Sequence, residues 1–175
     1  MANEQSSIVN QRLYFCRIHL DCLSSALKAQ KIPKVVVEQS LGESMVLHLM
    51  LTYRAYLQEI ALAYNVSNAT TQKTFDTSSE LVEFLSGQDC QSAEAQELLM
   101  LESNDSWLTQ LLLKYHQLGN SQFASMNRVR TGAPDQQFTL VQIDNDQSLD
   151  FETSEYYFHQ LNAVIENQRT RLEEW

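Results

Sequence analysis

The chain has 175 residues, of which 43% are hydrophobic and 19% are charged, with 12 lysine and arginine residues against 22 aspartate and glutamate residues. This length and composition fit one globular domain with its own core, and they exclude a disordered chain. The formal net charge of −10 disfavours binding to nucleic acid or to anionic lipid, because an acidic surface repels both. The chain holds only 4 glycines and 2 prolines, which favours long helices over hairpins and barrels.

The first 64 residues predict a helical hairpin. Apolar residues recur at spacings of three and four through residues 4–30, which indicates one long helix, and Pro33 marks the break before a second helix over 34–64. Two long helices joined by a short turn pack antiparallel. Gly42 lies inside the second helix, where it costs about 1 kcal/mol relative to alanine, so it indicates close packing or a bend.

The rest of the chain predicts shorter helices and one irregular segment. Residues 65–119 open with a polar connector, and residues 120–152 carry turn residues and alternating apolar positions, so we expect an irregular or short β excursion there. A last helix is expected over 153–175. Capping residues mark the expected helix starts: Thr77 or Ser78, Ser92, Asn104 or Asp105, and Thr153 or Ser154.

These elements together predict a single all-α domain over residues 1–175. We expect an antiparallel helical bundle built on the N-terminal hairpin (1–64), with the last helix and residues 106–118 as further members. The longest apolar stretch is interrupted by His48, Arg54, Gln58 and Glu59, so it predicts a buried helix and no membrane span. The N-terminus lacks the pattern of a signal peptide. Three cysteines without a Cys-x-x-Cys pair favour small buried thiols in a reduced, cytoplasmic compartment.

A line of polar residues runs along the buried side of the hairpin. On the first helix, Arg12 and His19 fall between an apolar arc (Val9, Leu13, Cys16, Leu20, Leu23 and Leu27) and a second arc (Ile8, Phe15, Ile18 and Cys22). On the second helix, His48, Thr52 and Glu59 share one face. Because buried polar groups need partners, we expect a semi-buried network of Arg12, His19, His48, Thr52 and Glu59. Such a network predicts that loss of Arg12 or Glu59 destabilises the fold.

Two functional interpretations compete with this structural one. Arg12 and His19 form an Arg-x6-His pattern that resembles the Arg-x4–6-His motif of HEPN-type ribonucleases, which are also helical bundles; the resemblance implies that Arg12 stabilises phosphate charge and His19 transfers protons. The second functional interpretation is a metal site. Against it, the four histidines lie on four different predicted helices and no Glu-x-x-His pair occurs. No glycine-rich phosphate loop is present either, so we expect no metal and no cofactor.

Four stretches resemble an uncharacterised gammaproteobacterial family of unknown function. They are NQRLYFCRIHLDCL, ESMVLHLMLTYRAYLQEIALAY, SNDSWLTQLLLKYHQL and RTRLEEW. The resemblance implies a small, intracellular, helical bacterial protein. It supplies no activity, ligand or catalytic residue.

The apolar surface favours a protein partner or self-association. The second helix is apolar nearly all round, and the arc that contains Ile8 and Phe15 adds a further apolar surface on the first helix. Tyr156, Tyr157 and Phe158 cover more than one face of the last helix and are interface candidates. We therefore expect a non-enzymatic scaffold or protein-interaction domain that forms a homodimer, with a HEPN-like ribonuclease as the alternative.

Overall fold

Six helices make up the part of the chain that the structure, a computed structural model, describes: residues 2–64, 74–119 and 149–173. They are α1 (Ala2–Ala29), α2 (Lys34–Ala63), α3 (Ser78–Ser86), α4 (Ala93–Ser103), α5 (Trp107–Gly119) and α6 (Phe151–Glu173). No strand occurs in these ranges, so the prediction of an all-helical fold is confirmed for them. The predicted excursion over 120–152 lies outside the described residues except for 149–152, of which 151 and 152 already belong to α6.

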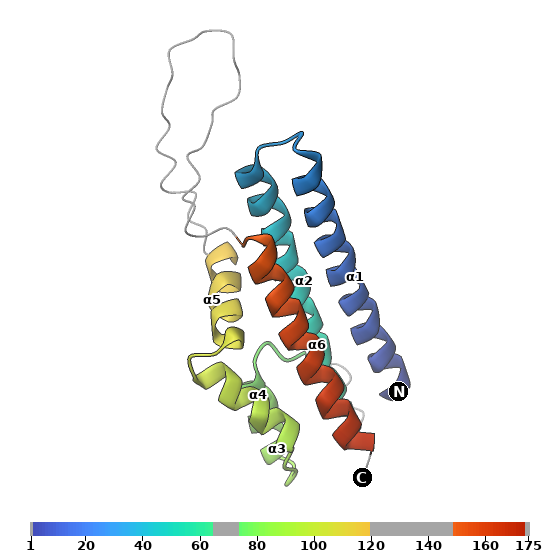
Figure 1. The fold of residues 1–175 in the computed structure, drawn as a ribbon. Coiled ribbons are helices and arrows are strands. Elements are labelled where there is room, and N and C mark those ends of the chain that lie inside the picture. Colours follow the sequence, from blue (N-terminus) through green and yellow to red (C-terminus); the bar gives the residue numbers. More distant parts are fainter. Residues whose placement is uncertain (1, 65–73, 120–148, 174–175) are drawn as a thin grey trace.

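The three long helices α1, α2 and α6 lie side by side, and the three short helices zigzag along one flank of α2 and α6 (Figure 1). A turn at Gln30–Pro33 joins α1 to α2, which run antiparallel. The N-terminal end of α1 and the C-terminal end of α6 both lie at the end of the bundle opposite this turn (Figure 1). Every other helix contacts α2. The centre of the fold is therefore α2, and α1 touches only α2 and α6 to any extent.

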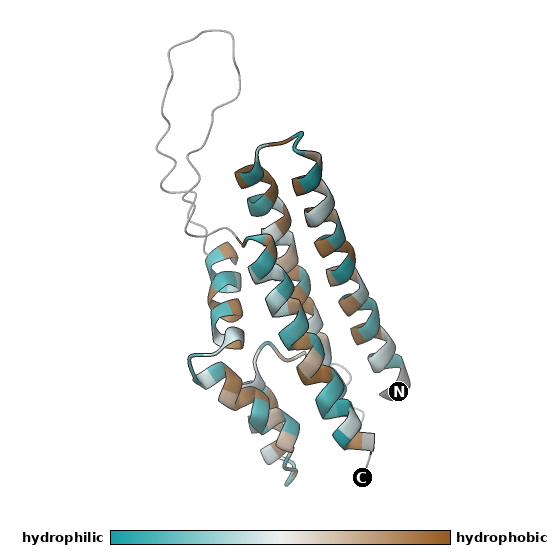
Figure 2. Cartoon of the chain, in the orientation of Figure 1, coloured by the Kyte–Doolittle hydropathy of each residue, from teal (hydrophilic) through white to brown (hydrophobic). Residues whose placement is uncertain are grey.

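The core takes side chains from all six helices, and α2 contributes most of them. The core-facing arc predicted for α1 is confirmed for Val9, Cys16, Leu20 and Leu23, which are all buried. Hydrophobic and hydrophilic stretches alternate along the α1 ribbon, as this one-sided packing requires (Figure 2). No helix within the described ranges is long and apolar enough to cross a membrane.

Local capping chemistry sets two of the short helices where the sequence predicted them. The Thr77 hydroxyl accepts a hydrogen bond from the Glu80 amide at the start of α3, and the Ser92 hydroxyl accepts one from the Ala95 amide at the start of α4. Each bond satisfies one of the amides that the first turn of a helix leaves free.

The starts of α5 and α6 differ from the prediction. The Ser106 hydroxyl accepts from the Leu108 amide at 3.1 Å, whereas Asn104 is the residue that ends α4. At α6, the Asp150 carboxylate accepts from the Thr153 amide at 2.8 Å, so the helix starts at Phe151, before the predicted Thr153 or Ser154. In both places several good capping residues stand together, and the path of the chain decides which one is used.

Gly42 marks the closest approach between α2 and the chain that enters α6. A Cβ atom built on Gly42 would lie 2.7 Å from the carbonyl oxygen of Leu149 and 3.0 Å from its Cβ. The first of these neighbours is a backbone atom, which cannot rotate away. The close-packing interpretation of this glycine therefore agrees with the structure.

We predict that Gly42→Ala destabilises the fold by about 1–3 kcal/mol, the usual cost of overpacking, although alanine normally stabilises a helix interior by about 1 kcal/mol over glycine. Gly87→Ala is the matched control, because its added Cβ would meet only ordinary contacts at 3.5 Å. Urea unfolding of the two variants checks this, and a Gly42→Ala variant as stable as Gly87→Ala would contradict the packing argument.

Candidate functional site

The structure brings two of the predicted site residues into direct contact. The imidazole rings of His19 on α1 and His48 on α2 stack with their centroids 4.3 Å apart and their planes 30° from parallel. Phe15 meets His48 edge-on, with the ring centroids 6.1 Å apart. The pair lies where α1 and α2 face each other, at the boundary between the buried and the exposed side of the hairpin.

The layer beneath the histidines is polar but neutral. The Thr52 hydroxyl donates to the carbonyl oxygen of His48 at 2.8 Å and lies 3.5 Å from the sulfur of Cys16. Burial raises the pKa of Cys16 to about 11, so this residue is a neutral thiol at neutral pH, a form that is a poor nucleophile. Of the other cysteines, Cys22 is exposed and Cys90 is partly buried; the expectation that all three are buried is wrong for Cys22, which lies on the outward side of α1.

The cluster carries positive charge without a compensating carboxylate. Burial, the neighbouring His19 and the charge of Arg12 together lower the pKa of His48, and Arg12 also acts on Cys16. Arg12 is half-buried and pairs with no acidic residue in the described part of the chain, whereas Arg17, Arg54, Arg169 and Arg171 each pair with a carboxylate. The Nδ1 atoms of His19 and His48 are enclosed and lack a hydrogen-bond partner.

Glu59, the acidic member of the predicted network, belongs to a different cluster. Its carboxylate receives two hydrogen bonds of 2.7 Å from Arg169 on α6 and one of 3.1 Å from the Ser6 hydroxyl on α1. Arg169 also donates to Asn10 at 2.8 Å. This second cluster thus joins α1, α2 and α6. Of the five residues predicted to form one network, Arg12, His19, His48 and Thr52 remain together, and Glu59 is separate.

The sequence analysis missed Arg169 and its neighbour Gln168. Gln168 is fully buried; it accepts from the Tyr56 hydroxyl at 2.8 Å and donates to Glu97 at 3.1 Å. The signal was present, because Gln168 follows Ile165 by three residues and continues the buried face of α6. A polar residue at such a position indicates a buried hydrogen bond.

The three aromatic interface candidates have different environments. Tyr157 and Phe158 are buried in the core, and the Tyr157 hydroxyl donates to Gln110 of α5 at 3.5 Å, whereas Tyr156 is 50% exposed. Three consecutive helical residues span about 200°, so they cannot all face solvent. Only Tyr156 is available to a partner.

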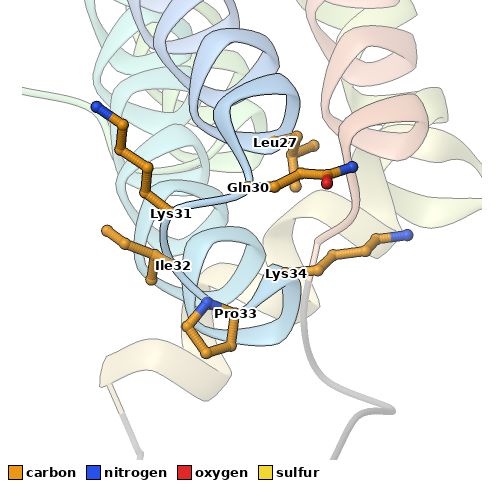
Figure 3. Close-up of a pocket in the computed structure, with 6 residues that line it drawn as sticks. All are labelled: Leu27, Gln30, Lys31, Ile32, Pro33 and Lys34. Atoms are coloured by element: carbon orange, nitrogen blue, oxygen red, sulfur yellow. The ribbon is translucent and has the colours of Figure 1, made fainter.

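A hollow at the α1–α2 turn is the main alternative location for a ligand. It is lined by Leu27, Gln30, Lys31, Ile32, Pro33 and Lys34 (Figure 3). Lys31 and Lys34 extend away from the turn in different directions and do not converge on one position (Figure 3). The described residues hold no group of three or more histidine, cysteine or acidic side chains that could bind a metal ion. The histidine cluster, about 12 Å further along α1, is the stronger candidate.

These features define an all-helical bundle with a histidine and arginine cluster where its two N-terminal helices pack together. The chain belongs to DUF6586, a family of unknown function, whose model matches residues 1–175. No curated protein and no solved structure matches it.

We predict that Glu59→Ala destabilises the fold by about 2–4 kcal/mol, because it leaves the Arg169 guanidinium unpaired in a site that is largely closed to water. Arg12→Ala removes no ion pair and should cost much less, contrary to the expectation from a single network. Arg17→Ala, whose pair with Asp21 is exposed on both sides, is the control and should change stability by less than about 0.5 kcal/mol. Equal losses for Arg12→Ala and Glu59→Ala in thermal melts would restore the single network.

We also predict that acid weakens the fold through His48. Its pKa in the folded chain lies below the ordinary value of 6.5, so its contribution to the free energy of unfolding is fully present above pH 6.5 and is lost as the pH falls through the lowered pKa. Melts between about pH 7.5 and pH 5.5 should show a smaller loss of Tm for His48→Gln than for the parent chain. His159→Gln alters an exposed histidine and should follow the parent; three identical pH profiles would exclude this role of His48.

Proposed function

We propose that the chain is a non-enzymatic protein-interaction domain that forms a homodimer through the outward side of its N-terminal hairpin. We call this surface the hairpin outer face: Ile8, Phe15, Ile18 and Cys22 of α1 with Leu47 and Leu51 of α2. The observation that carries the proposal is its exposed apolar area. Ile8 is 39% exposed, Ile18 41% and Leu47 44%.

The spacing on α1 supports a helical partner. The core-facing arc of α1 recurs at alternating spacings of four and three, and the outer face repeats the same rhythm at Ile8, Gln11, Phe15, Ile18 and Cys22. Such a spacing keeps one stripe of a helix against another helix. The first stripe is buried at Val9, Cys16, Leu20 and Leu23, whereas the second is exposed at Ile8, Ile18 and Cys22 and meets α2 at Phe15.

The width of the outer face favours a second copy over a single helix. Leu51 follows Leu47 by one turn, so α2 adds a stripe beside that of α1, and the face is two helices wide. Another hairpin of the same kind matches it in a four-helix arrangement, and symmetric dimers pair like surfaces. Ile8 and Cys22 are 14 residues apart, so the α1 stripe is about 21 Å long and the two-helix face about 20 Å wide. Polar residues that flank the stripe on both helices would have to supply the rest of the roughly 800 Å² per partner of a standard interface.

We predict that Ile18→Glu and Leu47→Glu each convert a dimer into a monomer at micromolar concentration, because each would bury an unpaired carboxylate between the two copies. Leu113→Glu is the control, since Leu113 on α5 is 57% exposed and lies off the outer face. Light scattering coupled to gel filtration measures the mass. A parent chain that stays monomeric throughout the micromolar range would overturn the proposal.

A HEPN-like ribonuclease that uses Arg12 and His19 is the second candidate function. The observation in its favour is that Arg12, which has no carboxylate partner among the described residues, lies near a stacked histidine pair, a combination that can bind phosphate and transfer protons. The net charge of −10 argues against RNA as a substrate. Cleavage of single-stranded RNA by the purified protein, lost in His19→Ala, would establish this function in place of the first.

The compartment stays a prediction. Free thiols at Cys16, Cys22 and Cys90 support a reduced compartment, and we propose the cytoplasm of a bacterium. Fractionation of cells that express the chain tests this directly.

A further inference from the structure

We infer that Arg12, His19 and His48 form a binding site for a small oxyanion, a carboxylate or a phosphate, at the edge of the contact between α1 and α2. The inference goes beyond self-association and does not depend on it. It rests on the charge balance around Arg12, on the stacked imidazoles and on the absence of a protein acceptor for any of the three side chains within the described ranges.

The first argument is the charge of Arg12. In a chain with 22 acidic and 12 basic residues, an arginine finds a carboxylate readily, and Arg17, Arg54, Arg169 and Arg171 all do so. Arg12 is half-buried and has no such partner among the residues that the structure places. A partly desolvated guanidinium without an anion is costly, and a bound oxyanion would remove that cost.

The second argument is the hydrogen-bonding capacity of the histidines. The enclosed nitrogen is Nδ1 in both rings, and it faces no acceptor. A proton on Nδ1 would be a buried donor without a partner, so the neutral rings favour the proton on Nε2. Nε2 is then the donor that each ring offers to a ligand, beside the fork of N–H groups on Arg12.

The surroundings define the class of ligand. A metal cation would be repelled by Arg12, and Cys16 beneath the rings is held as a neutral thiol. Arg169 of α6, which donates to Asn10 and Ser6 on α1, is already paired with Glu59. Phe15 covers one edge of His48, which limits the space and favours a compact ligand. A guanidinium with imidazole donors suits planar carboxylate and tetrahedral phosphate alike.

Binding of an anion must be linked to protonation of the histidines. Without a ligand, burial and the charges of His19 and Arg12 hold the pKa of His48 below its ordinary value. A bound oxyanion reverses the sign of the local charge and stabilises the imidazolium form. The anion should therefore raise the pH midpoint at which His48 titrates, and its affinity should increase as the pH falls through that midpoint.

The test is an NMR titration of the imidazole protons of the full chain, in a buffer free of oxyanions, with inorganic phosphate, acetate or sodium chloride added at equal ionic strength. We expect phosphate, acetate or both to raise the midpoint of His48 by about one pH unit and to shift the imidazole signals of the stacked His19 ring at constant pH. His116 and His159 are exposed and serve as internal references that should not move. A response to phosphate alone assigns the site to phosphates, and a response to acetate alone assigns it to carboxylates.

Two variants make the outcome specific. Arg12→Gln should abolish the anion response while leaving the spectrum of a folded chain, and Arg17→Gln should retain it, because Arg17 lies on the exposed side of α1. Shifts no larger than those in sodium chloride, or an unchanged response in Arg12→Gln, would overturn the inference. Light scattering on the same samples shows separately whether the chain self-associates, so failure of the proposed dimer and failure of the oxyanion site are distinguishable.

Discussion

Hydrogen bonds from polar side chains that α2 carries into the core hold the surrounding helices in place. The Tyr53 hydroxyl donates to Glu102 on α4 at 2.6 Å, the Tyr56 hydroxyl donates to Gln168 on α6, and Glu59 receives the guanidinium of Arg169. Burial raises the pKa values of Tyr53 and Tyr56, so both remain donors at any physiological pH. Apolar packing alone would allow these helices to slide or rotate on α2, whereas each of these bonds requires one position.

The histidine pair differs from these satisfied contacts. At Tyr53, Tyr56 and Glu59 the partner comes from another helix of the bundle, because α4 and α6 cover that side of α2. His48 contacts Phe15 and His19 of α1, and no third helix among the described residues supplies a partner to its enclosed Nδ1. This enclosed nitrogen without a partner, beside exposed apolar residues, is the feature on which the proposed ligand site depends.

Features that depend on residues close in sequence, or on the hairpin geometry, could be predicted from the sequence. The caps at Thr77 and Ser92 depend on residues three positions apart, and the meeting of His19 with His48 follows from counting back along two helices joined by a short turn. The pairing of Glu59 with Arg169 depends on how α6 is rotated about its own axis, which its spacing to α2 in the sequence does not determine. For the same reason the sequence analysis grouped Glu59 with the polar residues of α1 and α2. Only for these residues could the position along the hairpin axis be counted from the turn.

The contact at Gly42 has a consequence for the alignment of the bundle as a whole. If α6 slid along α2 by one helical turn, about 5.4 Å, the backbone at Leu149 would meet the side chain of Glu38 or Met45 in place of a bare glycine. The same displacement would separate Tyr56 from Gln168 and Glu59 from Arg169. The absence of a side chain at Gly42 and the two hydrogen-bonded pairs further along therefore fix one register between α2 and α6.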